Sequence, residues 1–424
     1  MNLSERDKER AIKASTLLFE AERPLRVLSK LAWRPSVKAE FFASGCCELP
    51  AVSYKQEKYD LSREHLKIAA PLLNGENPVS QMLRDTAHSI ELTIEMLEAI
   101  GTRSFGTFSS ALYGKPSDLT DLTKTSVHDL ALFLDRQLEG LHPHKQETEL
   151  FDADTFANLL APKVKDFFGD LAPQIKVIDN LSAKALAGRR FIKINKSSRF
   201  SFKDVSQLFH HEAVIHVGTT LNGLRQFDLP SISVPHAGTT KTQEGLAVFA
   251  EFMSGAMDPR RMRRLSDRVI ALEMAMSGAN FLDIYRFFLE RTDDPDLSFE
   301  NSRRVMRGGL ISGGAPFTKD IVYLEGLLHL HQFLKQLLSL GRADLIPLLF
   351  CGKIDIRHLP ALAILAKEKL IEPPIYLPPW AKDTDFLISF LAYSSFLNQP
   401  FADQDDKTLL SDLGTAPVLE RFNA

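Results

Sequence analysis

Two short stretches of alternating polar and apolar residues interrupt a chain whose other apolar residues mostly recur at helical spacing. The stretches cover residues 174–179 and 190–195, and a period of two is typical of half-buried strands. Ala187-Gly188, just before the second stretch, is predicted to be a turn. The pattern therefore predicts an α+β fold that is predominantly helical and contains one small sheet.

Helical periodicity and end signals predict the remaining elements. The expected helices cover residues 5–31 with a break near Pro24, 78–100, 126–139, 152–168, 201–221, a helix beginning at Glu244, 260–277, 279–291, 298–307, 319–339, 342–350, 355–369 and 384–396. Because 424 residues exceed what one hydrophobic core usually serves, we expect two closely packed parts. Residues 1–150 form a mainly helical part, and residues 151–424 contain the sheet.

Charge and cysteine content exclude several classes of protein. Lys and Arg total 51 against 54 for Asp and Glu, which gives no reason to expect nucleic acid or an anionic membrane as a partner. The charged N-terminus lacks the apolar segment of a secretory signal, and no apolar run is long enough to span a bilayer. An odd count of three cysteines indicates a reducing, cytoplasmic setting and argues against a thiolate metal site.

The predicted helix after the sheet carries two histidines. Ser201 and Asp204 form a capping box at its start, and Asn222-Gly223 ends it. His211 and His216 are five residues apart, which places them about 140° apart on a regular helix. Two such side chains cannot bind one metal unless the helix has a π-bulge or is unwound between them. The spacing therefore predicts an overwide or broken helix if the two histidines are partners.

Two glutamates favour that partnership. Glu212 directly follows the first histidine, where a general base stands when it must activate water without ligating a metal. Glu244 begins another helix after a loop, as the third ligand does in His/His/Glu zinc hydrolases. Gly245 and Ala247 are small, which would let this helix approach the histidine helix closely.

These residues also resemble a known family. Gln243-Glu-Gly-Leu-Ala247, downstream of a His-Glu-x-x-x-His helix, is similar to the QEGLA-motif proteins, among them the animal microtubule-associated tyrosine carboxypeptidases. The preceding strand pair, the Asn222-Gly223 stop and residues 317–326 extend the resemblance, which covers roughly residues 25–395. Some bacterial members of the family are described as modulating flavohaemoglobin expression.

The resemblance implies a function for the motif residues. It makes His211, His216 and Glu244 the ligands of one Zn²⁺ per chain and Glu212 the general base of hydrolysis. Residues 151–424 then form a zincin-like, metallopeptidase-like catalytic region. The expected activity is that of a zinc-dependent peptidase, a carboxypeptidase-type exopeptidase that acts on the C-terminus of a peptide or protein.

A carboxypeptidase also needs a cation for the substrate's terminal carboxylate and a donor for the oxyanion. Candidates for the cation are Arg303, Arg304, Arg307 and Lys319, and candidates for the donor are Tyr323 and Tyr285. No motif assigns these residues.

Other interpretations remain open at this point. The two histidines could form a polar helix face, and Glu244 could simply favour the helix dipole. We interpret His210 as packing, His236 as a solvated loop residue and Arg260–Arg264 as a solvated helix face. His329 and His331, two apart on a helix, face different sides and are not expected to be joint ligands.

Two competing functions use the same residues differently. A non-enzymatic regulatory or scaffold protein would keep the fold and the metal but would have no use for Glu212 beside the first ligand. A hydrolase of a non-peptide amide would use all four residues. The sequence leaves open the substrate, the choice between endopeptidase and exopeptidase, and the oligomeric state.

Overall fold

The computed structural model describes residues 3–120, 124–139, 150–179, 181, 183–188 and 190–397, and it divides the chain into two units. Unit 1 covers residues 1–382 and holds all the elements discussed below except one. Unit 2 covers residues 383–424, and its described part is the helix α18 (Asp385–Leu397). The predicted division of the chain near residue 150 stays a prediction.

Unit 1 is predominantly helical, as predicted. Its N-terminal third contains α1 (Glu5–Glu22), α2 (Val27–Lys30), α3 (Pro35–Ala43), α4 (Asp60–Ala69), the 3₁₀-helix η1 (Ala70–Leu73), α5 (Pro78–Glu98), α6 (Arg103–Tyr113) and α7 (Val127–Glu139). The break predicted near Pro24 separates α1 from α2, and Pro78 lies in the first turn of α5, where its missing N–H costs nothing. Three helices of this part, α3, α4 and α6, were not among the predicted elements.

The small sheet has three strands in the order β1-β3-β2. They are β1 (Gln174–Ile178), β2 (Ala185–Ala187) and β3 (Phe191–Asn195); β1 pairs with β3 in parallel and β2 pairs with β3 antiparallel. The two predicted strands are confirmed. Of the turn predicted at Ala187-Gly188, Gly188 lies in the connection between β2 and β3, and its N–H donates to the Phe191 carbonyl at 2.8 Å. Ala187 is instead the last residue of β2, a strand too short at three residues to show a period of two.

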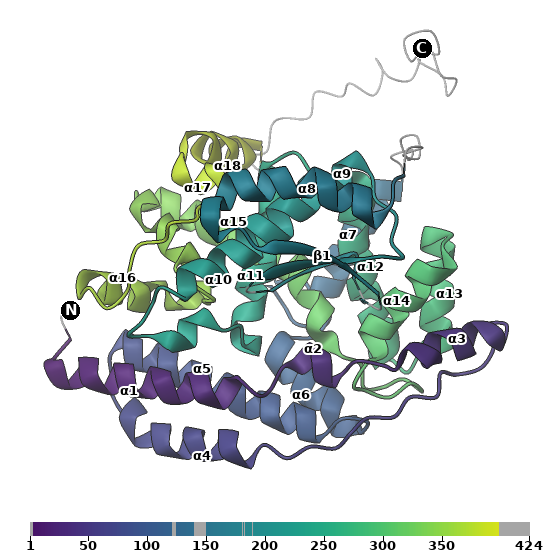
Figure 1. The fold of residues 1–424 in the computed structure, drawn as a ribbon, viewed down its shortest axis with the longest axis horizontal. Coiled ribbons are helices and arrows are strands. Elements are labelled where there is room, and N and C mark those ends of the chain that lie inside the picture. The colour runs from purple at the N-terminus through teal and green to yellow at the C-terminus, as the bar shows by residue number, and fades with distance from the viewer. Residues whose placement is uncertain are drawn as a thin grey trace, which may run out of the picture. The chain divides into compact units, whose positions relative to one another are not determined.

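One face of this sheet is covered by α8 (Ala153–Phe168), which lies across the top of Figure 1. Ile192 and Ile194 of β3 are fully buried in one core with Phe156 and Leu160 of α8. Ala213 and Val217 from the histidine segment belong to the same core. The apolar side of the histidine segment thus packs against the sheet and α8.

Beyond the sheet the chain returns to helices. In order they are η2 (Gly169–Leu171) beside α8, then α9 (Phe202–Leu208), the π-helix η3 (Phe209–Val217), α10 (Gly218–Gly223), η4 (Pro230–Ser233), α11 (Ala237–Met253), α12 (Pro259–Met276), α13 (Phe281–Thr292), α14 (Pro295–Met306), η5 (Thr318–Ile321), α15 (Val322–Ser339), η6 (Ala343–Phe350), η7 (Ile356–His358), α16 (Leu359–Lys367) and α17 (Pro379–Lys382). The capping box predicted at Ser201 and Asp204 is confirmed at the start of α9. No helix among the described residues is long and apolar enough to cross a membrane.

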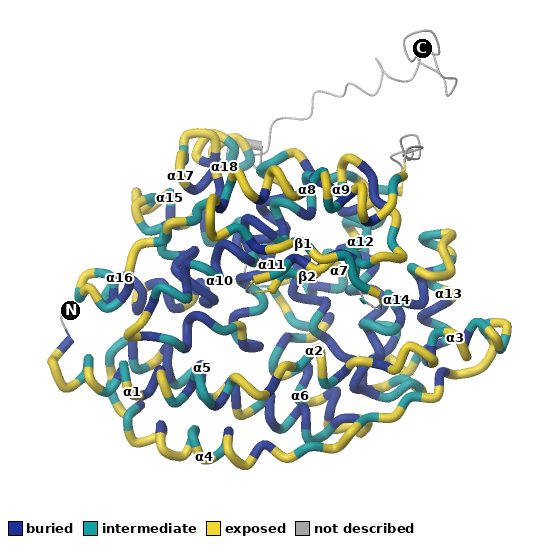
Figure 2. Tube along the Cα trace, in the orientation of Figure 1, coloured by how far each residue is buried: buried dark blue, intermediate teal, exposed yellow. Residues whose placement is uncertain are grey.

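Helix α11 is the central helix of unit 1 and is buried along most of its length (Figure 2). It crosses α15 at two glycines: a Cβ on Gly245 would lie 2.4 Å from the carbonyl oxygen of Gly326, and a Cβ on Gly326 would lie 2.4 Å from that of Lys241. Only glycine permits so close a backbone approach. Gly245 therefore serves contact with α15, and the prediction that it lets α11 approach the histidine helix is wrong.

Candidate metal centre

The histidine segment is wound as a π-helix. The π-helix η3 extends from Phe209 to Val217 and continues α9, so that the segment containing His211 and His216 has more than four residues per turn. A wider turn reduces the angle between residues five apart, and the two imidazole rings lie with their centroids 4.9 Å apart. The overwide helix predicted from the spacing is confirmed.

Helix α11 supplies a third side chain to these two. The prediction that Glu244 begins this helix is wrong, because α11 begins at Ala237 and Glu244 lies in its interior. Glu244 Oε2 lies 3.5 Å from His211 Nε2 and 3.4 Å from His216 Nε2. Among the described residues, these three form the group of potential ligands whose atoms all lie within 4.8 Å of one another. The structure therefore brings together the three residues that the sequence analysis selected.

The spacing of this group fits a metal better than it fits hydrogen bonds. N–H···O bonds are usually 2.7–3.2 Å long, so both contacts to Glu244 are too long, and its buried Oε2 has no hydrogen-bond partner. Nitrogen and oxygen ligands about 2.0–2.2 Å from a tetrahedral zinc ion lie about 3.3–3.6 Å from one another. A buried, unpartnered carboxylate oxygen at this distance from two imidazole nitrogens is the arrangement expected of a metal site.

A buried carboxylate contacts His211 at the ring nitrogen that does not face Glu244, and so orients the ring. Its Nδ1–H donates to Glu251 Oε1 at 2.7 Å, so Nε2 is the nitrogen that faces Glu244. Glu251 is fully buried and is itself held by Arg261, whose Nε and Nη2 donate to its two oxygens at 2.8 and 2.9 Å. Such outer partners fix the tautomer and the ring orientation of a ligating histidine.

This support was not predicted from the sequence. Glu251 lies seven residues after Glu244, two helical turns along α11 and on the same face, a spacing that could have indicated it. Arg261 was interpreted as part of a solvated basic face, and that prediction is wrong: Arg261 is buried against Glu251. Arg263 of the same run pairs with Asp135 at 3.0 Å.

Burial and neighbouring charges shift the pKa values of all three potential ligands. Burial alone would lower the pKa of His211, but its contacts with Glu244 and Glu251 outweigh burial and raise its pKa to about 10. Burial lowers the pKa of His216, and its contact with Glu244 only partly opposes this. Burial would raise the pKa of Glu244, but the charge of Lys319 and contacts with the histidines hold it well below its usual range. Lys319 Nζ donates to Glu244 Oε1 at 2.8 Å, so this predicted substrate residue holds the carboxylate.

Glu212 lies beside the group without belonging to it. It directly follows His211 in the π-helix but is not one of the three residues whose potential ligand atoms converge. The backbone N–H of Ala187 in β2 donates to Glu212 Oε2 at 2.8 Å. The edge strand of the sheet therefore fixes a carboxylate next to the three potential ligands.

A group of arginines adjoins the histidines through Tyr323. The ring of Tyr323 lies 6.5 Å from that of His211 and nearly parallel to it, and the guanidinium carbon of Arg268 lies 4.4 Å from its centroid. Arg304 donates to both oxygens of Asp320 at 2.8 and 2.7 Å and to the Tyr323 hydroxyl at 3.3 Å. The donor side chain predicted at Tyr323 is thus next to His211.

The cationic candidates differ in whether they have partners. Arg303 pairs with Glu300. Arg307 is 6% exposed, and its Nε has no hydrogen-bond partner, as is also true of Arg268 Nη1. Burial, with the nearby charge of Arg304, lowers the pKa of both Arg268 and Arg307 to about 10.

The other singled-out residues lie outside the group. His210 packs beside Phe209, in agreement with the packing interpretation. His236 is the N-cap residue of α11 and is buried against Ser89, so its interpretation as solvated is wrong. The Tyr285 hydroxyl donates to Cys46 Sγ at 3.6 Å.

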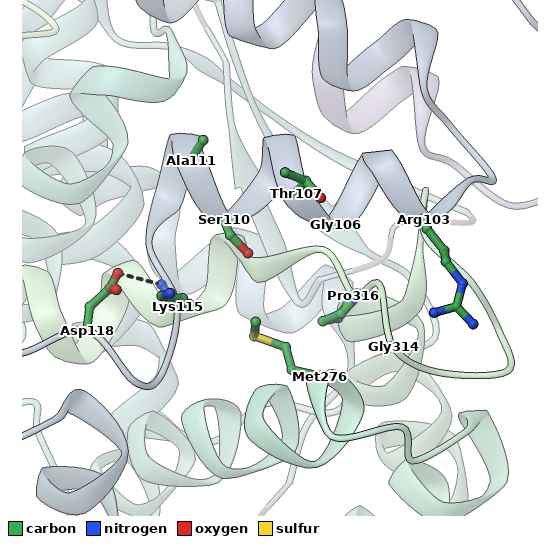
Figure 3. A pocket seen from close by; sticks show the side chains of 10 residues that line it. All are labelled: Arg103, Gly106, Thr107, Ser110, Ala111, Lys115, Asp118, Met276, Gly314 and Pro316. Atoms are coloured by element: carbon green, nitrogen blue, oxygen red, sulfur yellow. Dashed lines mark hydrogen bonds between the residues drawn. The ribbon is translucent and has the colours of Figure 1, made fainter.

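A surface groove of about 480 Å³ runs along α6 (Figure 3). It is lined by Arg103, Gly106, Thr107, Ser110, Ala111, Lys115, Asp118, Met276, Gly314 and Pro316. None of these is a residue of the metal group, and the carboxylate of Asp118 is bonded to the backbone N–H of Lys115 at 2.9 Å. The groove is therefore separate from the candidate metal centre.

Comparison with known proteins identifies a family for this chain. A family model described as "Microtubule-associated tyrosine carboxypeptidase" matches residues 39–399. No curated protein matches the chain. A solved structure from Colwellia psychrerythraea, whose description names a lipoprotein, is 12% identical with a TM-score of 0.42; the match covers 74% of this chain and 64% of that one. A structural similarity that weak adds nothing to the family match.

Proposed function

Because the chain belongs to the microtubule-associated tyrosine carboxypeptidase family, we propose that it is a zinc-dependent carboxypeptidase that acts on the C-terminus of a peptide or protein. The observation that carries the proposal is the buried group of His211, His216 and Glu244, whose potential ligand atoms lie within 4.8 Å of one another. The sheet, the π-helix and α11 then form a zincin-like catalytic core within residues 151–424. Free cysteines agree with a cytoplasmic setting.

The three side chains suit zinc in particular. Two imidazole nitrogens and one carboxylate oxygen are a common donor set of catalytic zinc, which keeps a fourth position for water or substrate. A bound Zn²⁺ supplies a Lewis acid and lowers the pKa of a coordinated water to about 7. Lys319 and Glu251 hold Glu244 and His211 in place for this role.

Glu212 is the general base of the proposed reaction. With Oε2 held by the N–H of Ala187, its other oxygen can accept a proton from the attacking water and return it to the leaving amine. Because the carboxylate is fixed by backbone, it needs no rearrangement before proton transfer. In this proposal Tyr323, whose ring stacks on that of His211, donates to the developing oxyanion.

We assign the substrate's terminal carboxylate to Arg307 and Arg268. Arg307 is buried and Arg268 is partly buried, and each has an unpartnered N–H group, although Arg268 also makes a long ion pair of 3.8 Å with Asp320. An anionic ligand would relieve the cost of desolvating both cations. Arg303 and Lys319, the other predicted cations, already pair with Glu300 and Glu244. A free C-terminus is therefore the substrate feature that this site favours.

Elemental analysis combined with Glu212→Gln tests the proposal. We expect about one zinc per chain in both proteins, and a loss of peptide hydrolysis of about 10²–10⁴-fold in the variant. Substrates are peptides that differ in the C-terminal residue, tyrosine included, each with a free or an amidated C-terminus. Glu48→Gln, an exposed site, is the matched control and should retain activity.

Three outcomes separate the alternatives. Protein that lacks zinc after zinc-replete preparation contradicts the proposal. Zinc-bound protein that hydrolyses no peptide favours the regulatory or scaffold function. Equal activity on free and amidated C-termini would leave a metallohydrolase but exclude a carboxypeptidase.

A further inference from the structure

Lys353 is a buried lysine that contacts both elements of the metal group. It is 6% exposed, and its ammonium donates to the backbone oxygen of His216 at 2.9 Å, to Thr219 Oγ1 at 2.9 Å and to Gln243 Oε1 at 3.2 Å. An ammonium has three donors, so three acceptors satisfy it. Two acceptors lie on the continuous π- and α-helical segment that holds the histidines, and the third lies on α11.

The first contact is at one potential metal ligand. Besides Lys353, the hydroxyl of Thr220 donates to the His216 carbonyl at 2.7 Å. A π-helix is rare and has less favourable hydrogen bonding than an α-helix, so it persists where other groups stabilise it. Side-chain donors at this carbonyl, where η3 passes into α10, are such a stabilisation.

The contact of Lys353 with Gln243 lies next to another potential metal ligand, Glu244. Gln243 immediately precedes Glu244 and is buried. Its Oε1 accepts from Lys353 and lies 2.9 Å from Thr219 Oγ1, whose single hydroxyl hydrogen also has the Ile215 carbonyl as an acceptor at 2.7 Å. Lys353, Thr219 and Gln243 thus form a triangle of polar contacts between the histidine segment and α11. We call this triangle the clamp.

Lys353 is itself anchored through its backbone. Its N–H donates to the carbonyl oxygen of Ile232 at 2.7 Å, and a Cβ on the preceding Gly352 would lie 2.3 Å from that oxygen. The ammonium therefore extends from a fixed point. Its burial is unfavourable, since desolvation lowers the pKa of Lys353 to about 7, and no carboxylate contacts it in the described structure.

We propose that Lys353 is a positioning residue that fixes the distance between His216 and Glu244, so that both bind one metal. The inference rests on the proposed function, because it concerns the same metal group. It assigns a role to Gln243 in the QEGLA motif, which connects the clamp to Glu244. Neither residue touches substrate in this proposal.

Zinc affinity and the visible spectrum of the Co²⁺-substituted protein test the clamp without any substrate. Lys353→Met should weaken zinc binding about 10–100-fold, as loss of outer support does at metal sites, and should alter the Co²⁺ ligand-field bands. Thr219→Val, which keeps the buried charge, should give a smaller change in the same direction. The control is Lys241→Met, because Lys241 lies on α11 with Gln243 but pairs with Glu325 and not with the clamp. This variant should leave the zinc affinity unchanged.

A double variant shows whether the clamp acts as one unit. If it does, Lys353→Met combined with Gln243→Leu weakens binding by less than the product of the two single effects. If Lys353→Met fails to fold, Thr219→Val and Gln243→Leu still test the inference. Wild-type affinity and an unchanged Co²⁺ spectrum in all folded variants would overturn the clamp while leaving the proposed function intact. Failure of the wild-type protein to bind metal would overturn both.

Discussion

The metal group and the arginine group are neighbours on either side of Tyr323, yet their charges are arranged in opposite ways. At the metal group, three potential ligand atoms converge, and the unpartnered atom is an acceptor, Glu244 Oε2. At the arginine group, which consists of Arg268, Arg304 and Arg307, Arg304 and Arg268 pair with the carboxylate of Asp320, and the unpartnered atoms are donors of Arg268 and Arg307. In the proposed function, the first region would bind a cation and the second an anion.

The difference restricts what can bind across both regions. A molecule that contacts both must present an electron-pair donor to the first and a negative charge to the second. The last peptide bond of a polypeptide has both features, because its carbonyl lies close to the terminal carboxylate. The contrast between the two groups thus favours an exopeptidase over an endopeptidase.

Lowering the pH should weaken zinc binding at the metal group and leave the charge of the arginine group unchanged. This is the largest expected effect. The pKa of His211 is raised to about 10, so zinc must displace a proton from it below that pH. Protonation competes with the metal, and zinc affinity should fall about tenfold per unit, or about 100-fold from pH 8 to pH 6. Arg268 and Arg307, with pKa about 10, stay charged over this range.

Chelator competition measures the zinc affinity, corrected for the chelator's own protonation. Binding of a product with a free carboxylate to the zinc-loaded protein, compared at pH values where zinc stays bound, checks the arginine group and should not weaken. A flat zinc profile would mean that His211 is not protonated in the metal-free protein.

Removing the charge of Glu251, which contacts His211, should weaken zinc binding at the metal group without affecting the arginine group. Glu251→Gln deletes the carboxylate that orients Nδ1–H, and zinc affinity should fall about 10–100-fold. Because Arg261 then loses its counter-charge, circular dichroism must show that the variant is folded. Glu98→Gln, which breaks a part-exposed pair with Arg63, serves as the control. Unchanged affinity in folded Glu251→Gln would show that the carboxylate does not support the site.

Removing a cation from the arginine group should weaken substrate binding and leave zinc binding unchanged. Arg307→Met is expected to raise KM for peptides with a free C-terminus about tenfold, since a charged hydrogen bond contributes about 1.5–3 kcal/mol. Zinc content should stay the same, and the thermal unfolding midpoint should be equal or higher, because Met removes an unpaired buried donor. Arg286→Met, at the surface, is the control. A large loss of stability would instead make Arg307 a structural residue.

The sequence predicted the parts of this site that depend on local spacing. His211 and His216, five residues apart, required a widened helix, and the π-helix is there. Ser201 and Asp204 predicted where that segment begins, because a capping box involves only four residues. The two longer strands were found for the same reason, while the three-residue β2 was not.

The parts that depend on distant residues could not be predicted. Lys353 meets Gln243 across 110 positions of sequence, and Glu212 meets Ala187 only because an edge strand passes beside η3. Arg261 was interpreted from its basic neighbours as solvated, whereas its environment is decided by the fully buried Glu251 on another helix. Contacts of this kind follow from the tertiary fold, which overrides local pattern.

The crossing of α11 and α15 at Gly245 and Gly326 has a consequence for how the motif should be used to infer activity in relatives. The glycine of Gln243-Glu-Gly-Leu-Ala247 serves helix packing, so selection for a folded chain alone would preserve it. A relative could lose hydrolysis and still retain that glycine and the resemblance it carries. If the proposed function holds, His211, Glu212 and His216 are the positions whose identity would distinguish an enzyme from a folded descendant without activity.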